Sequence, residues 1–313
     1  MIDIRLLKYV VAVNETKNFS RAAELLCIAQ PSLSQQIAKL ERELGVRLFL
    51  RTHTGIRPTP EGMTFIEKAT RIIRLDEDLE REMKEHSQGI GQELSIGTTA
   101  ITGGHVLPPL LQVFNKRFPR VRIRLVEASS EQLEDFTNNG EVDFSILSLP
   151  LKHPQLTYVP LLTEPLLLAL PQKEQEWMSS TVLGWISPNI ELAPNNVDLA
   201  QASHMPFVLL KEGFGFRETV LQMCAENGFQ PHIAYETSSI ETAQALVAHG
   251  LGITVIPKMV AHQDKGSPKY ATIQSAPTRT LVFAYAKERY LCLTAQKFLE
   301  IFNDNAAGLT TTT

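Results

Sequence analysis

Residues 19–45 read FSRAAELLCIAQPSLSQQIAKLERELG, and this stretch predicts two short helices joined by a tight connection. Pro31 suits the first turn of the second helix, where its missing N–H costs no hydrogen bond, and Gly45 suits the end of that helix. Apolar side chains recur every three or four residues along the second helix and mark one buried face: Leu33, Ile37, Leu40 and Leu44. Serines and glutamines near its start complete the pattern of a helix-turn-helix.

The flanking segments extend this pattern into a small domain. Leu6, Val10 and Val13 form one apolar helical face ahead of the pair. Residues 47–59, RLFLRTHTGIRPT, predict a short hairpin with Gly55 at its turn and arginines along it, which is a wing. We therefore predict an all-α winged helix-turn-helix domain over residues 1–59. The alternative is a small helical bundle with a solvated basic face.

A long helix is expected from Pro60 to about Ser87, followed by a hinge at Gly89 and Gly91. Its apolar positions step by four and three residues with one acid among them: Phe65, Ala69, Ile72, Asp76, Leu79 and Met83. Such a heptad seam favours dimerisation through residues 60–89. The alternative is that the helix docks on its own domain.

Strand-like and helix-like segments alternate from Glu93 onward. Strand-like runs such as LSIGTT, VRIRLVEA and DFSILSL are separated by helix-like runs such as VLPPLLQVFNKRF and SEQLEDFTNN. The alternation predicts an α/β domain over residues 90–313, with parallel sheets covered by helices on both faces. We expect lobe I at about 90–161 and 268–305, lobe II at about 162–267, and an irregular stretch at 172–195.

Charge is distributed unevenly along the 313 residues, whose net charge is −4. Residues 1–59 carry nine Lys and Arg against five Asp and Glu, whereas residues 90–313 carry sixteen against twenty-one. A basic N-terminal segment in an otherwise acidic chain suggests that this segment binds a polyanion. No apolar run is long enough to span a bilayer, and the first twenty residues lack the features of a secretory signal. The three cysteines fit neither a disulfide framework nor a zinc site, so we expect a reduced, cytoplasmic protein without a metal or cofactor.

The sequence offers little support for an enzyme. The histidines are scattered without metal-ligand spacing, and neither a G-x-S-x-G elbow nor a phosphate-cradling loop is present. A solute-binding protein of periplasmic type is the main rival, because the C-terminal part has that architecture. The helix-turn-helix and the absence of a signal sequence argue against this rival.

One family shares these features in the same order. The chain resembles the LysR-type transcriptional regulators through matching positions that include Ala22, Ala23, Leu26, Gln30, Pro31, Ser32, Leu33, Ser34, Ile37, Leu40, Leu44, Gly45, Leu48, Phe49, Arg51, Thr59 and Gly62. The resemblance implies a bacterial regulator that binds double-stranded promoter DNA as a dimer or tetramer and contacts RNA polymerase. It also implies a periplasmic-binding-protein-like domain that senses a small molecule. Ala29 departs from the family, which usually has Ser or Thr at that position.

The DNA-binding residues are expected at the start of the second helix of the pair, which would enter the major groove. Gln30, Ser34 and Gln35 are placed to reach base edges, and Pro31 and Ser32 to give apolar and phosphate contacts. Ser20 and Arg51 suit phosphates. For Arg51 the alternative is a salt bridge within the domain.

The effector site is expected beyond the carboxyl ends of strands, where helices begin. The candidates are small polar residues and glycines at those places: Thr98, Thr99, Thr102, Ser129, Ser130, Ser148, Gly213, Gly215 and Thr237. Hydroxyls and free backbone N–H groups aimed at one cleft suit a small, anionic metabolite. The alternative is that these serines and threonines only cap helices. Arg217 either clamps a carboxylate or is solvated, and the sequence favours the second reading.

Overall fold

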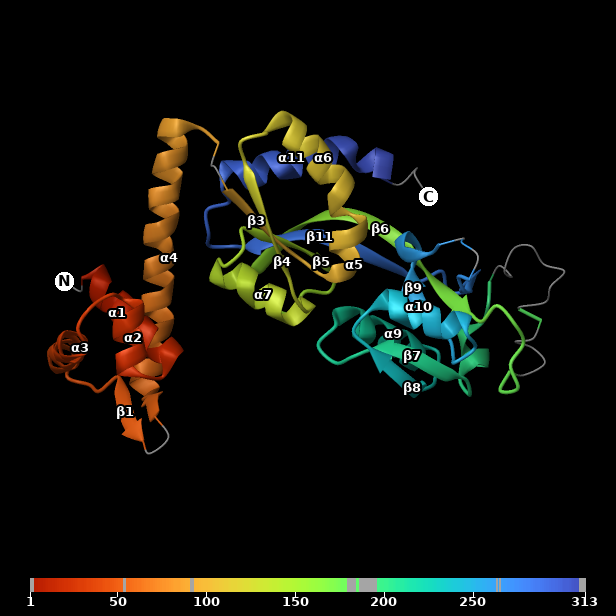
Figure 1. Ribbon diagram of the computed structural model, residues 1–313, viewed down its shortest axis with the longest axis horizontal. Helices are drawn as coiled ribbons and strands as arrows, with labels where there is room; N and C mark the ends of the chain where they lie inside the picture. The colour runs from red at the N-terminus through yellow and green to blue at the C-terminus, as the bar shows by residue number, and fades with distance from the viewer. Residues whose placement is uncertain are drawn as a thin grey trace. The chain divides into compact units, whose positions relative to one another are not determined.

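The computed structural model describes residues 3–52, 55–90, 93–178, 184–185, 196–262, 264 and 266–309. These form two compact units, Met1–Gly89 and Ile90–Thr313, which are described separately (Figure 1). Most of the expected 172–195 stretch lies outside the described residues. No helix in the described part of the chain is long and apolar enough to cross a membrane.

The N-terminal unit contains the predicted helix-turn-helix and hairpin. Its elements are α1 (Ile4–Thr16), α2 (Phe19–Leu25), α3 (Gln30–Leu44), β1 (Phe49–Thr52), β2 (Gly55–Pro58) and α4 (Pro60–Gln88). The apolar faces of the first three helices meet in one core around Val10, Val13 and Leu33, as the spacing predicted. β1 and β2 pair antiparallel, so the wing is a two-stranded hairpin.

Polar contacts fix the hairpin between α3 and α4. Oε1 of Glu41 on α3 accepts the N–H of Leu48 at 2.7 Å and that of Phe49 at 3.2 Å. Thr59 caps α4, because its Oγ1 accepts the N–H of Gly62 at 2.9 Å and donates to the carbonyl of Arg47 at 2.6 Å. A Cβ on Gly62 would lie 2.0 Å from the carbonyl oxygen of Leu48, so only glycine allows this approach.

The predicted seam of α4 divides into a buried and an exposed part. Ala69 is buried beside α1. Farther along, the seam residues Ile72, Leu79 and Met83 and the neighbouring Leu75 are between 49% and 59% exposed. In the structure, the whole seam is therefore not packed against its own unit.

The C-terminal unit consists of two lobes, each with its own core. The first lobe contains β3 (Glu93–Thr98), α5 (Ala100–His105), α6 (Leu107–Arg117), β4 (Arg122–Glu127), α7 (Ser130–Asn139), β5 (Phe144–Ser148) and α11 (Leu293–Leu309). The second contains η1 (Leu199–Ala202), β7 (Pro206–Leu210), α9 (Gly215–Glu226), β8 (His232–Thr237), α10 (Ile240–Ala248), β9 (Thr254–Pro257), η2 (Lys258–Val260) and β10 (Lys269–Thr272). Two strands run between the lobes, β6 (Leu156–Leu170) and β11 (Thr278–Ala286).

The sheets are only partly parallel, which corrects the prediction from the alternating pattern. β3 is parallel to β4 and β5, and β7 is parallel to β8. β6 is antiparallel to β9, β10 and β11, and β11 is also antiparallel to β5. The reason is that β6 carries the chain out of the first lobe and β11 carries it back. β10 still pairs with β6 in the second lobe, where Ala271 is part of the core, so the return occurs after Thr272 rather than near residue 268.

Replacing Gly62 by alanine tests the close approach of α4 to the hairpin. The added methyl group would meet backbone, so we expect Gly62→Ala to destabilise the N-terminal unit by about 1–3 kcal/mol. Hydrogen exchange of peptides from α1 and α4 should become about tenfold faster or more. Gly104→Ala is the matched control, because nothing lies within 4 Å of its added Cβ. Equal exchange in Gly62→Ala and wild type would contradict the steric argument.

Candidate functional site

The first turn of α3 presents a polar surface. Pro31, Ser32 and Gln35 are exposed, and Ala29 at the N-cap makes no side-chain cap hydrogen bond. Nε2 of Gln30 donates to Oγ of Ser34 at 2.9 Å, so these two side chains are held together. The candidates on α3 therefore form one surface, and Gln30 is partly oriented before any partner arrives.

Two further candidates of the N-terminal unit lie outside α3. Ser20 is exposed on the first turn of α2, where its N–H donates to Oδ1 of Asn18 at 2.8 Å. Arg51 lies on β1 opposite Ile56, but its side chain is outside the described part of the structure. The alternative of a salt bridge at Arg51 therefore stays open.

A cavity of about 230 Å³ lies between the two lobes of the C-terminal unit. Polar and apolar side chains of both lobes line it: Thr99, Ala100, Ile101, Ser130 and Ser148 from the first, Leu210, Phe214, Gly215, Phe216, Ser238, Ser239, Ile240 and Glu241 from the second, and Arg279 from β11. A cavity between lobes that combines apolar walls with a few polar groups is typical of small-molecule sites.

The structure brings some of the predicted effector residues to this cavity. Thr99, Ser130, Ser148 and Gly215 line it, and Gly213 lines a smaller neighbouring cavity of about 80 Å³.

The other four candidates, Thr98, Thr102, Ser129 and Thr237, line neither cavity. Thr98 and Thr102 are buried, and Oγ1 of Thr237 accepts the N–H of Ser239 at 3.2 Å.

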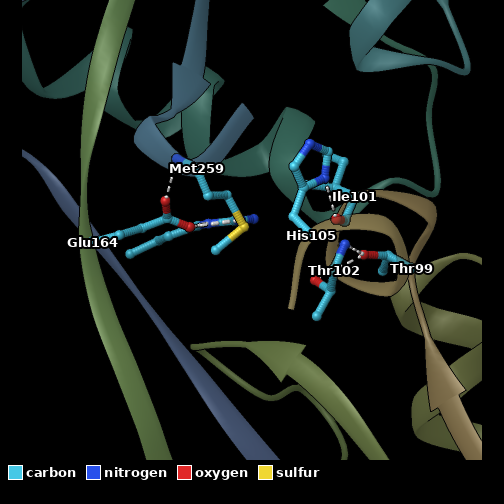
Figure 2. A network of polar contacts seen from close by, with 7 residues as sticks. Thr99, Ile101, Thr102, His105, Glu164 and Met259 are labelled. Atoms are coloured by element: carbon cyan, nitrogen blue, oxygen red, sulfur yellow. Dashed lines mark hydrogen bonds and ion pairs between the residues drawn. The ribbon is translucent and has the colours of Figure 1, made fainter. Parts of the chain in front are cut away.

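Helix capping accounts for several of these side chains. Ser129 forms a capping box with Gln132 at the start of α7. Thr99 is the N-cap of α5, where its Oγ1 accepts the N–H of Thr102 at 3.5 Å and donates to Oγ1 of the same residue at 3.2 Å (Figure 2). Thr99 both caps a helix and lines the cavity. Its capping role therefore does not exclude a contact with a ligand.

Four helices begin at the cavity wall. Ala100, Ser130, Gly215 and Ile240 are the first residues of α5, α7, α9 and α10, and all four line the cavity. Unpaired N–H groups and the positive end of the helix dipole favour an anion at such positions. The arrangement therefore places the N-terminal N–H groups of several helices at the cavity wall.

Arg279 is one of several cavity-lining residues that the sequence did not indicate. It lies on β11 directly opposite Glu164 on β6, and the two side chains form an ion pair at 2.7 Å. The side chains are only 4% and 8% exposed. Burial lowers the pKa of Arg279, and the nearby Glu164 carboxylate partly opposes that shift. No local sequence pattern signals this pair, because its members lie on strands far apart in the chain.

Arg217 has a different role from either one considered above. Its side chain is only 11% exposed and forms an ion pair with Glu236. Its Nη1 also donates to the carbonyl of Leu210 at 2.6 Å. The interpretation as a solvated residue was wrong, because the guanidinium holds the start of α9 to β7 and β8.

Comparisons with known proteins agree along the whole chain. Residues 4–63 match the family model of the bacterial regulatory helix-turn-helix protein, lysR family, and residues 87–307 match that of the LysR substrate binding domain. An uncharacterized HTH-type transcriptional regulator of Bacillus subtilis, YcgK, is 50% identical and is covered over 95% of its length by 97% of this chain. The OxyR regulator of Escherichia coli is 30% identical over 91% of this chain and 89% of its own. A solved full-length OxyR variant of Pseudomonas aeruginosa aligns with a TM-score of 0.67 and 25% identity, covering 98% of this chain and 95% of that one.

Replacing Ser129 by alanine separates helix capping from cavity lining. Loss of the capping box should lower the free energy of unfolding of the C-terminal unit by about 1 kcal/mol. Ser130→Ala is the control, because Ser130 lines the cavity but does not cap α7. Its free energy of unfolding is expected to change by less than about 0.5 kcal/mol. Urea unfolding followed by fluorescence measures this unit, because both tryptophans of the chain, Trp177 and Trp185, lie in it. A larger loss in Ser130→Ala would contradict the assignment.

Proposed function

The chain belongs to the LysR family of transcriptional regulators, and from this premise we propose that a small anionic metabolite in the inter-lobe cavity controls its binding to promoter DNA. The observation that carries the proposal is the convergence of four helix N-termini on one cavity, in a chain whose other unit is a winged helix-turn-helix. A ligand can change DNA binding only if it favours one arrangement of the protein over another.

The first turn of α3 supports a role in reading base edges. Gln30, Ser34 and Gln35 are side chains of the length and type that pair with bases in the major groove. Pro31 and Ser32 are exposed beside them and are proposed to add apolar and phosphate contacts.

Ser20 and Arg51 are proposed to contact the phosphate backbone. Because its proposed partner is chromosomal DNA, the protein is expected to work in the compartment that holds the chromosome.

The anionic character of the effector follows from the cavity wall. Backbone N–H groups at the starts of α7, α9 and α10 favour negative charge. Ser130 and Ser148 add hydroxyl groups to the same wall, which Thr99 also lines. Thr98, Thr102, Ser129 and Thr237 are better explained by burial or local capping than by ligand contact.

Dimerisation is proposed through the exposed apolar stripe of α4, formed by Ile72, Leu75, Leu79 and Met83. Four large apolar side chains at helical spacing in contact with water favour a partner surface of the same kind. A second copy of the same helix supplies that surface.

Two other functions are less favoured. A periplasmic solute-binding protein has no use for the helix-turn-helix that the chain carries. Enzymatic activity is less favoured, because both family models that match the chain are those of transcription regulators.

Control by thiol oxidation is also less favoured, although relatives from Escherichia coli that are 30% identical are named hydrogen peroxide-inducible genes activator. Cys224 and Cys292 are buried, and Cys27 lies in the N-terminal unit. Burial raises the pKa of Cys224 to about 12, so this thiol stays protonated at neutral pH, whereas the thiolate is the reactive form. A bound metabolite therefore explains the cavity better than cysteine chemistry does.

Substitutions in α3 and in the wing test the DNA-binding proposal. Gln30→Ala should cost about 1–3 kcal/mol on a preferred duplex and relax the sequence preference, because it removes a base contact. Arg51→Ala should weaken binding to all sequences alike and reduce the salt slope by about one. The measurement is fluorescence anisotropy with a duplex selected from random DNA by the wild type. Equal affinity of the wild type for selected and random duplexes would contradict the proposal.

A charge in the exposed stripe of α4 tests dimerisation. Leu79→Asp would bury a carboxylate in the proposed apolar interface, so the protein should shift toward monomer in sedimentation experiments. Leu25→Asp is the matched control, because Leu25 is equally exposed but lies on α2, outside the stripe. An unchanged dimer in Leu79→Asp, or an equal shift in both variants, would place the interface elsewhere.

A further inference from the structure

The guanidinium of Arg279 has one end that the protein does not use. Nε donates to Oε1 of Glu164 at 2.7 Å, Nη2 lies 2.7 Å from the same oxygen, and Nη2 also approaches the sulfur of Met259 at 3.3 Å. Among the described residues, none accepts a hydrogen bond from Nη1. Arg279 lines the inter-lobe cavity although its side chain is only 4% exposed. Nη1 is therefore available to donate a charge-assisted hydrogen bond to an acceptor in the cavity.

The surrounding contacts hold this guanidinium in one orientation. Oε1 of Glu164 accepts the hydrogen bond from Nε of Arg279. Oε2 of Glu164 accepts the N–H of Met259 at 2.9 Å (Figure 2). Both carboxylate oxygens are therefore engaged. The ring of Phe216 lies against the cation, with its centre 5.6 Å from Cζ. Arg279 is thus oriented before a ligand arrives, which reduces the entropic cost of binding.

The charges around the cavity favour a ligand with one negative charge. Glu164 neutralises Arg279, so the buried pair carries no net charge. Glu241, the other ionisable residue in the wall, is exposed to water, which screens it. The helix N-termini remain, each equivalent to about half a positive charge. For the three longer helices, α7, α9 and α10, this amounts to roughly one to two positive charges, which favours a carboxylate over a neutral molecule or a cation.

Size and wall chemistry restrict the rest of the ligand. A cavity of about 230 Å³ corresponds to roughly seven or eight water molecules. Ile101, Leu210, Phe214 and Phe216 supply apolar walls. The ligand body is therefore small and mostly apolar.

We propose that Nη1 of Arg279 binds the carboxylate of a small, mostly apolar monocarboxylic acid, and that Glu164 lowers the affinity for this anion by neutralising the same arginine. This inference rests on the proposed function, because it names the ligand class and the receiving group of the same cavity. Arg279 is a specificity-determining residue in this scheme, and Glu164 acts through it as a positioning residue.

The test uses a panel of small apolar monocarboxylates, each paired with its neutral carboxamide. Thermal shift of the full-length wild type identifies the members that bind, and titration calorimetry gives their affinities. We expect binding by carboxylates at least about tenfold tighter than by the matched carboxamides. A panel in which no carboxylate binds at millimolar concentration, or in which carboxamides bind equally well, would overturn the proposal.

Variants then assign the contact to the buried pair. Glu164→Gln keeps a hydrogen-bond acceptor for Arg279 but removes the competing charge, so carboxylate affinity should rise roughly three- to tenfold. Arg279→Met combined with Glu164→Gln leaves no unpaired buried charge, so the protein should fold while carboxylate affinity falls at least about tenfold. The paired variant Arg124→Met with Glu93→Gln is the control, because it removes an exposed pair that does not line the cavity.

Carboxylate affinity is expected to rise in the single variant Glu164→Gln and to fall in the double variant with Arg279→Met. These opposite changes distinguish ligand binding from a merely structural role. Unchanged or lower affinity in Glu164→Gln, or undiminished affinity in the double variant, would overturn the assignment to Arg279. DNA binding is measured separately on the selected duplex. If the wild type binds the carboxylates but not DNA, the proposed function fails while the ligand assignment stands.

Discussion

The antiparallel pairing of β6 with β11 is the constraint on which the C-terminal unit depends. These two strands are shared by both lobes, so the cavity between the lobes is bounded by a ladder of backbone hydrogen bonds. Arg279 and Glu164 lie opposite each other on this ladder. Any motion of one lobe against the other must bend or twist these strands near a buried ion pair. Breaking such a pair leaves an uncompensated charge, so the pair is expected to stay intact while the lobes move.

Coupling between ligand and fold follows from which elements meet at the cavity. α7 and its cap belong to the first lobe, whereas α9 and α10 belong to the second. An anion held by the N-termini of both sets is attracted most strongly when the lobes are close, because Coulomb attraction falls with distance. Under the proposed function, an anionic ligand would therefore favour the closed arrangement by its differential affinity, and a regulator needs such a preference.

The N-terminal unit depends on a comparable set of local contacts. Glu41 ties the hairpin to α3, and Thr59 and Gly62 bring the start of α4 against the hairpin. The recognition surface and the long helix are therefore held through one small hairpin. A change in the direction of α4 would be transmitted to α3 through the hydrogen bonds that Thr59 and Glu41 make to the backbone of residues 47–49.

Local patterns in the sequence determined the elements of both units. Spacings of three and four residues predicted α1, α3 and α4, and Gly45 and Pro60 marked where helices end or begin. The same patterns predicted most strands and helices of the α/β unit, but not α5, β10, the first part of β6, or the antiparallel course of β6 and β11. Capping serines and threonines were identified as candidates, but the sequence could not separate Thr99, which lines the cavity, from Ser129, which does not.

Only the tertiary structure decided which of these residues line the same cavity and which charged side chains pair with one another. Arg279 and Glu164 carry no local signal, because their pairing depends on the register of two strands that are distant in the chain. Arg217 looks like a solvated residue of a first helical turn until β8 places Glu236 beside it. Periodicity and capping act within a few residues and can be read from the sequence. Strand register and charge pairing arise from long-range packing and become visible only in the folded chain.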